Sequence, residues 1–190
     1  SNSQLSNIIS VVVNSVDMSS NGITLGTVTA NTITLDAGTA AISDNNNGGS
    51  VNLIANDVNL MATNGIGTMT NAIDMQVDSG EISAINKNGG DGAITNTGNV
   101  LLRKVSNLDG DGDILIVNNG DLTIDTIETI TDFTDSGTGR IDMNVDNGDI
   151  LGAQKANYTS QSDIRAHSVG FLLDNNHSIG NGVRPLSVEA

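Results

Sequence analysis

The feature that most constrains the fold of this chain is a short turn-and-strand unit that recurs along it. In each unit a glycine is followed by a polar residue, and then by apolar residues in alternation with others. The unit occurs as GSVNL at Gly49, GEISA at Gly80, GNVLL at Gly98, GDILI at Gly112, GDLTI at Gly120, GRIDM at Gly139 and GDILG at Gly148. Glycine suits a sharp turn because it adopts positive φ without steric cost. The unit therefore predicts strands of roughly three to five residues joined by tight turns.

The spacing of these units indicates a repetitive architecture. Gly98 and Gly120 are 22 residues apart, Gly120 and Gly148 are 28 apart, and helical periodicity is almost absent. Repeats of roughly 20 to 30 residues that hold two or three short strands are typical of a parallel β-solenoid. We expect about eight coils of roughly 20–28 residues, stacked about 4.8 Å apart.

Composition separates this fold from its main alternative, an antiparallel β-sandwich. The chain has no Trp, one Tyr and two Phe, so Ile, Val, Leu, Ala and Met must fill its core. A β-sandwich usually buries an aromatic residue and has longer strands. The variable coil length and the scarcity of aromatics favour the solenoid, with the β-sandwich kept as the alternative.

The whole chain, residues 1–190, is expected to be a single β-solenoid segment of a longer tandem array. Its first residues are already strand-like, and no polar capping repeat is evident at either end. NGIGTMTNAIDMQV, which begins at Asn64, has a looser echo in HSIGNGVRPLSVEA, which begins at His177. Aligning Ile66 with Ile179 keeps the apolar register of the two stretches, which suggests a second long unit.

One stretch departs from the repeating pattern. AQKANYTSQSDIRAHSV, from Ala153 to Val169, has no glycine-led turn and contains the one Tyr and one of the two His. We expect it to leave the rod as a loop excursion or a short helix.

The charge of the chain limits its partners. Twenty-two acidic residues against seven basic ones give a net charge of −15. Nucleic acids and anionic lipids both require basic patches, so neither is an expected partner. No segment approaches the roughly 20 apolar residues of a membrane span, so membrane insertion is not expected.

The turn LDGDGDI places three carboxylates at alternate positions. Asp109, Asp111 and Asp113 are candidate calcium ligands, because calcium takes six to eight oxygen ligands. An EF-hand loop would require glycine at Ile114 and an acid at Gly120, and the chain has neither. The alternative is a solvated turn, and no other cofactor is expected.

Catalytic residues are not predicted. Asp142, Asp146 and Asp149 lie close in sequence to Arg140, and carboxylate clusters serve polysaccharide-active β-helix enzymes. In so acidic a chain such clustering arises by default, and an aromatic platform for sugars is missing. We therefore expect a non-enzyme, with a polysaccharide-active β-helix enzyme as the weaker alternative.

NGIGTMTNAIDMQVDS together with GDILIVNNGDLTI resembles the repeat regions of bacterial filamentous-haemagglutinin-like large exoproteins. The resemblance covers roughly Thr32 to Gly152 and again His177 to Ala190. It implies a right-handed parallel β-helix, export to the bacterial cell surface, and adhesion or cell–cell contact. The resulting expectation is an extracellular structural or adhesive segment that acts as a rigid spacer in a surface or fibre protein. Its partners would be neighbouring repeats or further copies of itself. The alternative is an adhesin module that binds a glycan or a cell-surface receptor through the Ala153–Val169 excursion.

Overall fold

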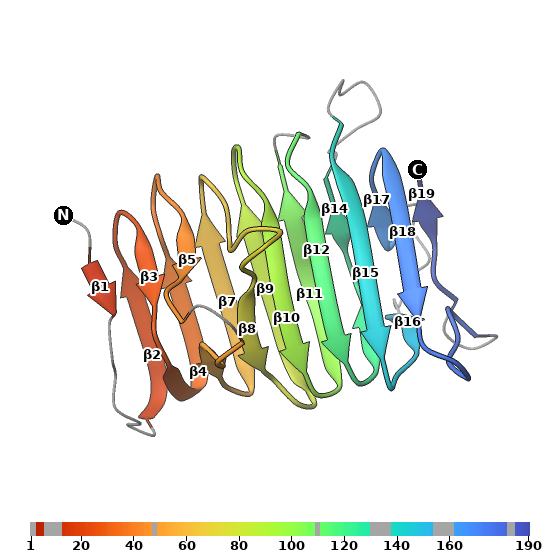
Figure 1. Ribbon diagram of the computed structural model, residues 1–190, viewed down its shortest axis with the longest axis horizontal. Helices are drawn as coiled ribbons and strands as arrows, with labels where there is room; N and C mark the ends of the chain where they lie inside the picture. The colour runs from red at the N-terminus through yellow and green to blue at the C-terminus, as the bar shows by residue number, and fades with distance from the viewer. Residues whose placement is uncertain are drawn as a thin grey trace.

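The computed structural model describes residues 3–5, 13–46, 49–108, 111–129, 138–153, 162–181 and 185–190. Within these ranges the chain forms strands and turns, and no helix. The strands stack in parallel as a β-solenoid of about six turns, which confirms the predicted fold class. Figure 1 shows them side by side along the long axis, with β1 at one end and β19 at the other.

The strands of the described ranges are as follows: β1 (Ser3–Leu5), β2 (Val13–Ser19), β3 (Ile23–Leu25), β4 (Val28–Asp36), β5 (Ile42–Asp44), β6 (Leu53–Ile54), β7 (Asp57–Ala62), β8 (Ile73–Gln76), β9 (Gly80–Asn86), β10 (Gly92–Thr97), β11 (Val100–Asn107), β12 (Ile114–Asn119), β13 (Leu122–Ile124), β14 (Ile127–Glu128), β15 (Arg140–Asp146), β16 (Ile150–Gly152), β17 (Ile164–Arg165), β18 (Ser168–Leu173) and β19 (Val188–Glu189).

The turns can be followed at one position that recurs in register. Its successive occupants are Ile23, Ile42, Ile66, Gly92, Ile114, Ile141 and Val169. The shortest step between them runs from Ile23 to Ile42 and the longest from Ile141 to Val169, so the coil length varies as predicted. The number of turns, about six, is smaller than the expected eight.

Each turn carries strands on two faces, and β4 shows how the chain passes from one to the other. Val28 and Thr29 of β4 pair with β6, whereas residues 32–36 pair with β7. Every pairing between named strands is parallel in the described part of the chain. The antiparallel β-sandwich is therefore excluded. The right-handed winding stays an expectation from the family resemblance.

The core is a column of aliphatic side chains that stack from rung to rung. One ladder in register consists of Leu35, Leu60, Ala84, Val105, Ile127 and Ile164. Each of these side chains is at most 3% exposed. On the other face, a second ladder consists of Ile73, Ile94, Ile116 and Met143. Since successive side chains of a strand point to opposite faces, the alternating sequence buries one face and leaves the other polar.

Part of the stretch Ala153–Val169, where a loop excursion was expected, belongs to the solenoid. β17 pairs with β14 and β19, and β18 pairs with β15, so both belong to rungs of the solenoid. Ala166, between them, is fully buried. Residues 154–161 of the predicted excursion lie outside the described residues. The strands from Ile164 onward were missed because no glycine-led turn precedes them.

The echo between Ile66 and Ile179 does not mark a second long unit. Ile66 bridges to Ile42 on the face of β3 and β5, whereas Ile179 bridges to Ile150 on the face of β13 and β16. The glycine after each isoleucine has φ of 66°. Each of these glycines also donates its N–H to the backbone carbonyl of an isoleucine in the preceding rung, Gly67 to Ile42 at 2.9 Å and Gly180 to Ile150 at 2.7 Å. The same local corner is thus used at two different places on the coil.

Candidate functional site

The most continuous set of polar side chains follows one corner of the solenoid, just before β9, β11, β13 and β16. We call Ser79, Asn99, Asp121, Asp149 and Ser178 the corner ladder. They occupy equivalent positions, because the residues that follow them pair in register from Gly80 to Ile179. The corner ladder therefore runs across five successive rungs.

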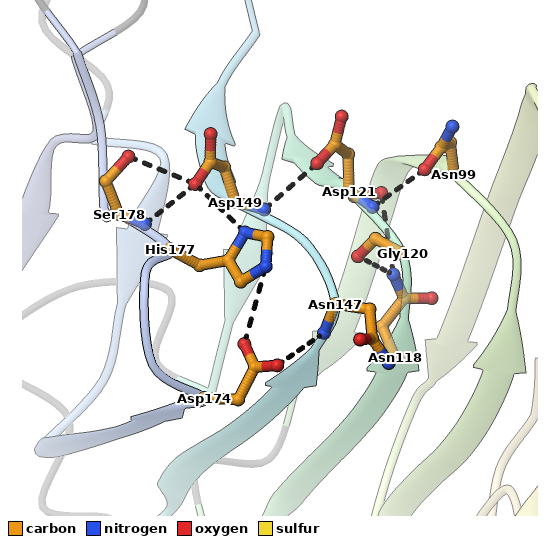
Figure 2. A network of polar contacts seen from close by, with 9 residues as sticks. All are labelled: Asn99, Asn118, Gly120, Asp121, Asn147, Asp149, Asp174, His177 and Ser178. Atoms are coloured by element: carbon orange, nitrogen blue, oxygen red, sulfur yellow. Dashed lines mark hydrogen bonds and ion pairs between the residues drawn. The ribbon is translucent and has the colours of Figure 1, made fainter.

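Side-chain oxygens of the corner ladder accept hydrogen bonds from the backbone of the next rung. Asn99 Oδ1 accepts the N–H of Asp121 at 2.8 Å, and Asp121 Oδ1 accepts the N–H of Asp149 at 3.0 Å. Asp149 Oδ1 accepts the N–H of Ser178 at 2.7 Å and its hydroxyl at 3.1 Å (Figure 2). A backbone N–H in a turn must find an acceptor outside the strand ladder, and a carboxylate is a strong one. Each such bond ties one rung to the next.

The bonds around Asp149 favour its ionised form. The hydrogen bond from the Ser178 backbone is the largest cause that lowers the pKa of Asp149 below its ordinary value. The Ser178 hydroxyl and the nearby His177 act in the same direction, and desolvation acts against them. The carboxylate is thus held ready to accept hydrogen bonds at neutral pH.

His177 lies between two carboxylates at the C-terminal end of the corner ladder, as Figure 2 shows. Its Nδ1 is 3.6 Å from Asp149 Oδ1, and its Nε2 is 3.7 Å from Asp174 Oδ1. Asp174 Oδ2 also accepts the N–H of Asn147, at 3.1 Å. Both ring distances exceed those of ordinary hydrogen bonds, so the imidazole interacts with the two acids chiefly by charge when protonated.

A shallow groove lies on the surface of the rod in two parts, of which the second is lined by Ser79, Asn99 and Asp121 of the corner ladder. One part of it, of about 570 Å³, is lined by Asn14, Thr29, Ala30, Asn31, Ile54, Ala55, Asn56, Gln76 and Asp78. The next part, of about 250 Å³, is lined by Ser79, Gly80, Asn99, Val100, Leu101, Asp121, Thr123 and Leu151. The two parts meet at the consecutive residues Asp78 and Ser79, and we call them together the axial groove. Its amides, hydroxyls and carboxylates can hydrogen-bond a polyhydroxyl ligand, but no aromatic ring lines either part.

The predicted calcium ligands are only partly described. Asp109 lies outside the described residues, and Asp111 is exposed. Asp113 belongs to another rung-to-rung series, because its N–H donates to Asp91 Oδ1 at 3.2 Å and its own Oδ1 accepts the N–H of Arg140 at 2.9 Å. In the part of the chain that the structure describes, no three or more His, Cys, Asp or Glu residues form a metal-binding group. Calcium at this turn stays a prediction.

The acids considered for catalysis take separate partners. Asp142 pairs with Arg140 on the same strand. Asp149 belongs to the corner ladder, and the backbone carbonyl of Asp146 accepts the N–H of Gly120 at 2.9 Å. The Asp142 pair lies within one strand and the other two contacts join rungs, and we assign no catalytic residue.

The sequence interpretation missed a set of buried asparagines. Asn86 Nδ2 donates to Asn107 Oδ1 at 2.8 Å, and Asn96 Nδ2 donates to Asn118 Oδ1 at 2.9 Å. All four side chains are at most 3% exposed. The signal was present as asparagines that recur after 21 and 22 residues in consecutive coils. These amides link turn backbone and neighbouring rungs inside the corners.

A scan against protein-family models gives no match, and comparisons with curated proteins and with solved structures likewise give none. Among the described residues, no helix has the length and apolarity needed to cross a membrane.

Proposed function

We propose that this chain is a rigid β-solenoid spacer within a bacterial surface or fibre protein. The observation that carries the proposal is the unbroken parallel pairing along the rod, from β2 and β4 to β17 and β19. Interior rungs are bonded to both neighbours on two faces, so bending the rod requires many hydrogen bonds to distort together. The extracellular location and the fibre context rest on the family resemblance.

The surface of the rod also suits a spacer. Carboxylates such as those of Asp121 and Asp149 accept turn N–H groups while keeping the exterior charged and soluble. Pairs between rungs add to this, as where Arg103 contacts both Glu81 and Asp125. The natural partners of such a segment are neighbouring repeats or further copies, since β18 presents Leu172 at 64% exposure near the C-terminal end.

Single-molecule stretching tests the spacer role. The chain has no cysteine, so Ser19→Cys and Leu172→Cys supply unique attachment points on exposed residues. A rigid spacer keeps a constant extension as the load rises, and then lengthens in steps of about 80 Å as coils of about 24 residues unravel. The control carries Ile114→Asp, which should abolish the steps. Smooth lengthening of the unmodified protein at low load would refute the proposal.

The axial groove favours a second candidate function, binding of a linear glycan or receptor along the rod. Its polar lining over several rungs is the specific observation in favour. Binding to a glycan array and to intact bacterial and host cells should be compared with that of Thr123→Arg, which obstructs the groove. Asn59→Arg is the matched control, because Asn59 is exposed on β7 and lines neither part of the groove. Saturable binding lost only in Thr123→Arg would make the segment an adhesive module, whereas no binding leaves the spacer role alone.

A further inference from the structure

Asp44 is a carboxylate in an unusual place, at the inward-facing end of β5. It is only 8% exposed. In the parallel pairing of β3 and β5 it lies beside Leu25, a core residue of the preceding rung. An ionised carboxylate taken out of water costs several kcal/mol unless its oxygens are bonded or neutralised. The contacts of both carboxylate oxygens therefore decide what holds Asp44 there.

Only one oxygen of Asp44 is satisfied. Oδ1 accepts the N–H of Asn46 at 2.6 Å and the Nδ2 amide of Asn52 at 2.6 Å. Oδ2 is buried and has no hydrogen-bond partner, and the same is true of Asn46 Nδ2. Two buried polar atoms without partners thus lie two residues apart in one turn. Native proteins rarely leave such atoms unpaired, so both atoms point to a bound polar group or ion at this turn.

A second acid, Asp74, lies on the next rung, between the buried residues Ile73 and Met75 of β8. Asn52 links the two, since its Nδ2 donates to Asp44 and its Oδ1 accepts the N–H of Asp74 at 2.8 Å. Burial is the largest cause that raises the pKa of Asp74, and the charge of Asp44 is the next. Thr95, beside Asp74 in register, acts in the opposite direction and lowers that pKa. Two acids that repel each other and an unpaired oxygen together favour a cation.

We propose that a calcium ion binds at this turn, with Asp44 Oδ2 and the side-chain oxygen of Asn46 as ligands and Asp74 as the second negative charge. The Asn46 oxygen reaches the ion when its amide group is flipped, which exchanges Nδ2 for Oδ1 with little change in shape. An acid and an amide two residues apart match the ligand spacing of calcium loops, and water completes the coordination. Oxygen-only donors in an irregular arrangement suit calcium better than magnesium, which requires a near-ideal octahedron.

This site is separate from the turn of Asp109, Asp111 and Asp113, and it does not depend on the spacer role. Bound calcium neutralises Asp44 at the end of β5, a strand in the orange part of Figure 1. The N-terminal third of the rod would then be more stable with calcium than without it.

Calorimetric titration of the full chain with calcium chloride tests the site, together with thermal unfolding in calcium and in EDTA. The variants are Asp44→Asn and Asp74→Asn. Asp17→Asn is the matched control, because it removes the same charge from an exposed position on β2. We expect one saturable site in the unmodified protein and in Asp17→Asn, and binding at least tenfold weaker in the two other variants. We also expect Asp44→Asn to raise the unfolding temperature in EDTA, since it removes an uncompensated buried charge.

Three outcomes would overturn the proposal. The first is no heat and no calcium-dependent shift of unfolding temperature in the unmodified protein. The second is binding that survives in Asp44→Asn and Asp74→Asn as it does in Asp17→Asn, which would indicate diffuse attraction to an acidic surface. The third is equal affinity for magnesium and calcium. If Asp44→Asn fails to fold, Asp74→Asn and the titration of the unmodified protein still decide the question.

Discussion

The carboxylate of Asp121 accepts the backbone N–H of Asp149, 28 residues later, at 3.0 Å. Asp121 in turn donates its own N–H to Asn99 Oδ1 at 2.8 Å. Aspartate and asparagine thus perform the same task at one corner in successive rungs. At the Asn99 position a neutral amide oxygen is sufficient, so the bond between these rungs requires an acceptor at the right height rather than a charge.

This equivalence predicts different results for two substitutions at Asp121. Asp121→Asn keeps an acceptor oxygen, so the free energy of unfolding should change by less than about 0.5 kcal/mol. Asp121→Ala leaves the N–H of Asp149 without its partner, and should lower the free energy of unfolding by about 1 kcal/mol. Urea denaturation followed by circular dichroism measures both. Equal losses in the two variants would mean that charge, rather than the acceptor, stabilises the corner.

Inward and outward positions on β12 should respond very differently to the same new charge. Ile114 is fully buried, and Ile114→Asp places a carboxylate among the aliphatic ladders, so it should cost more than about 4 kcal/mol and unfold the rod. Val117→Asp is the control, because Val117 is half-buried and lies between Thr95 and Asn144 of the adjacent rungs. Limited proteolysis and circular dichroism report folding. Similar behaviour of the two variants would refute the assignment of faces.

The fold could be predicted because its signals are local. A glycine-led turn and the alternating residues after it, as in GDILI at Gly112, fix a strand and its buried face without reference to distant parts of the chain. The pairing of Val105 with Ile127 then follows, because these residues have the same 22-residue spacing as Gly98 and Gly120. The long step from Ile127 to Ile164 was not predictable, because residues inserted in a coil leave no trace in the pattern of the strands that flank them.

The polar interior was the part that the sequence pattern concealed. The inward positions of β10 include Asn96, although an asparagine normally indicates a turn or the surface. For the same reason Asp44, at the end of β5, could not be recognised from the sequence as an inward residue. Such residues are inward only because another rung, or a ligand, supplies their hydrogen bonds, and a partner that lies a whole coil away in the sequence is not visible in a local pattern.

The buried amide of Asn96 should be replaceable by neither an apolar nor an acidic residue. Its Oδ1 accepts the N–H of Val77 at 2.8 Å, and its Nδ2 donates to Val77 O at 3.1 Å and to Asn118 Oδ1 at 2.9 Å. Asn96→Leu leaves these groups unpaired and should cost about 3 kcal/mol. Asn96→Asp brings a carboxylate oxygen against two acceptors and should cost at least as much.

Denaturant unfolding of the Asn96 variants should be measured beside Asn59→Asp. Asn59 is exposed on β7, so this control adds the same charge outside the core and should stay within about 0.5 kcal/mol of the unmodified protein. If Asn96→Leu proved as stable as the control, the asparagine pair would not support the corner.

A side chain at Gly67 would be unfavourable for two reasons, positive φ and crowding, and a matched substitution separates them. It has φ of 66°, and an added Cβ would lie 2.5 Å from the carbonyl oxygen of Ala93. Gly49 also has positive φ, 86°, but an added Cβ there meets nothing within 4 Å. Gly49→Ala should therefore cost about 1 kcal/mol from backbone strain alone. Gly67→Ala should cost about 2 kcal/mol more, because the Ala93 backbone must move. Thermal unfolding of both variants distinguishes strain from crowding, and equal costs would show that only φ matters.

The dependence of stability on pH should contain a contribution from Asp149. Its pKa is lowered in the folded protein, chiefly by the hydrogen bond from the Ser178 backbone, relative to an unfolded value of about 3.9. A lowered pKa means that the carboxylate stabilises the fold at pH values above about 4, and that this stabilisation is lost as the pH falls through the folded-state pKa. Asp149→Asn keeps an acceptor oxygen but does not titrate in this range, so it is the matched reference. The difference between the two proteins removes the contribution of the other acids, which both share. The unfolding temperature of the unmodified protein should exceed that of Asp149→Asn most at neutral pH, and the difference should shrink as the pH falls below about 4. Parallel curves over that range would show that the corner does not distinguish the ionised from the neutral side chain.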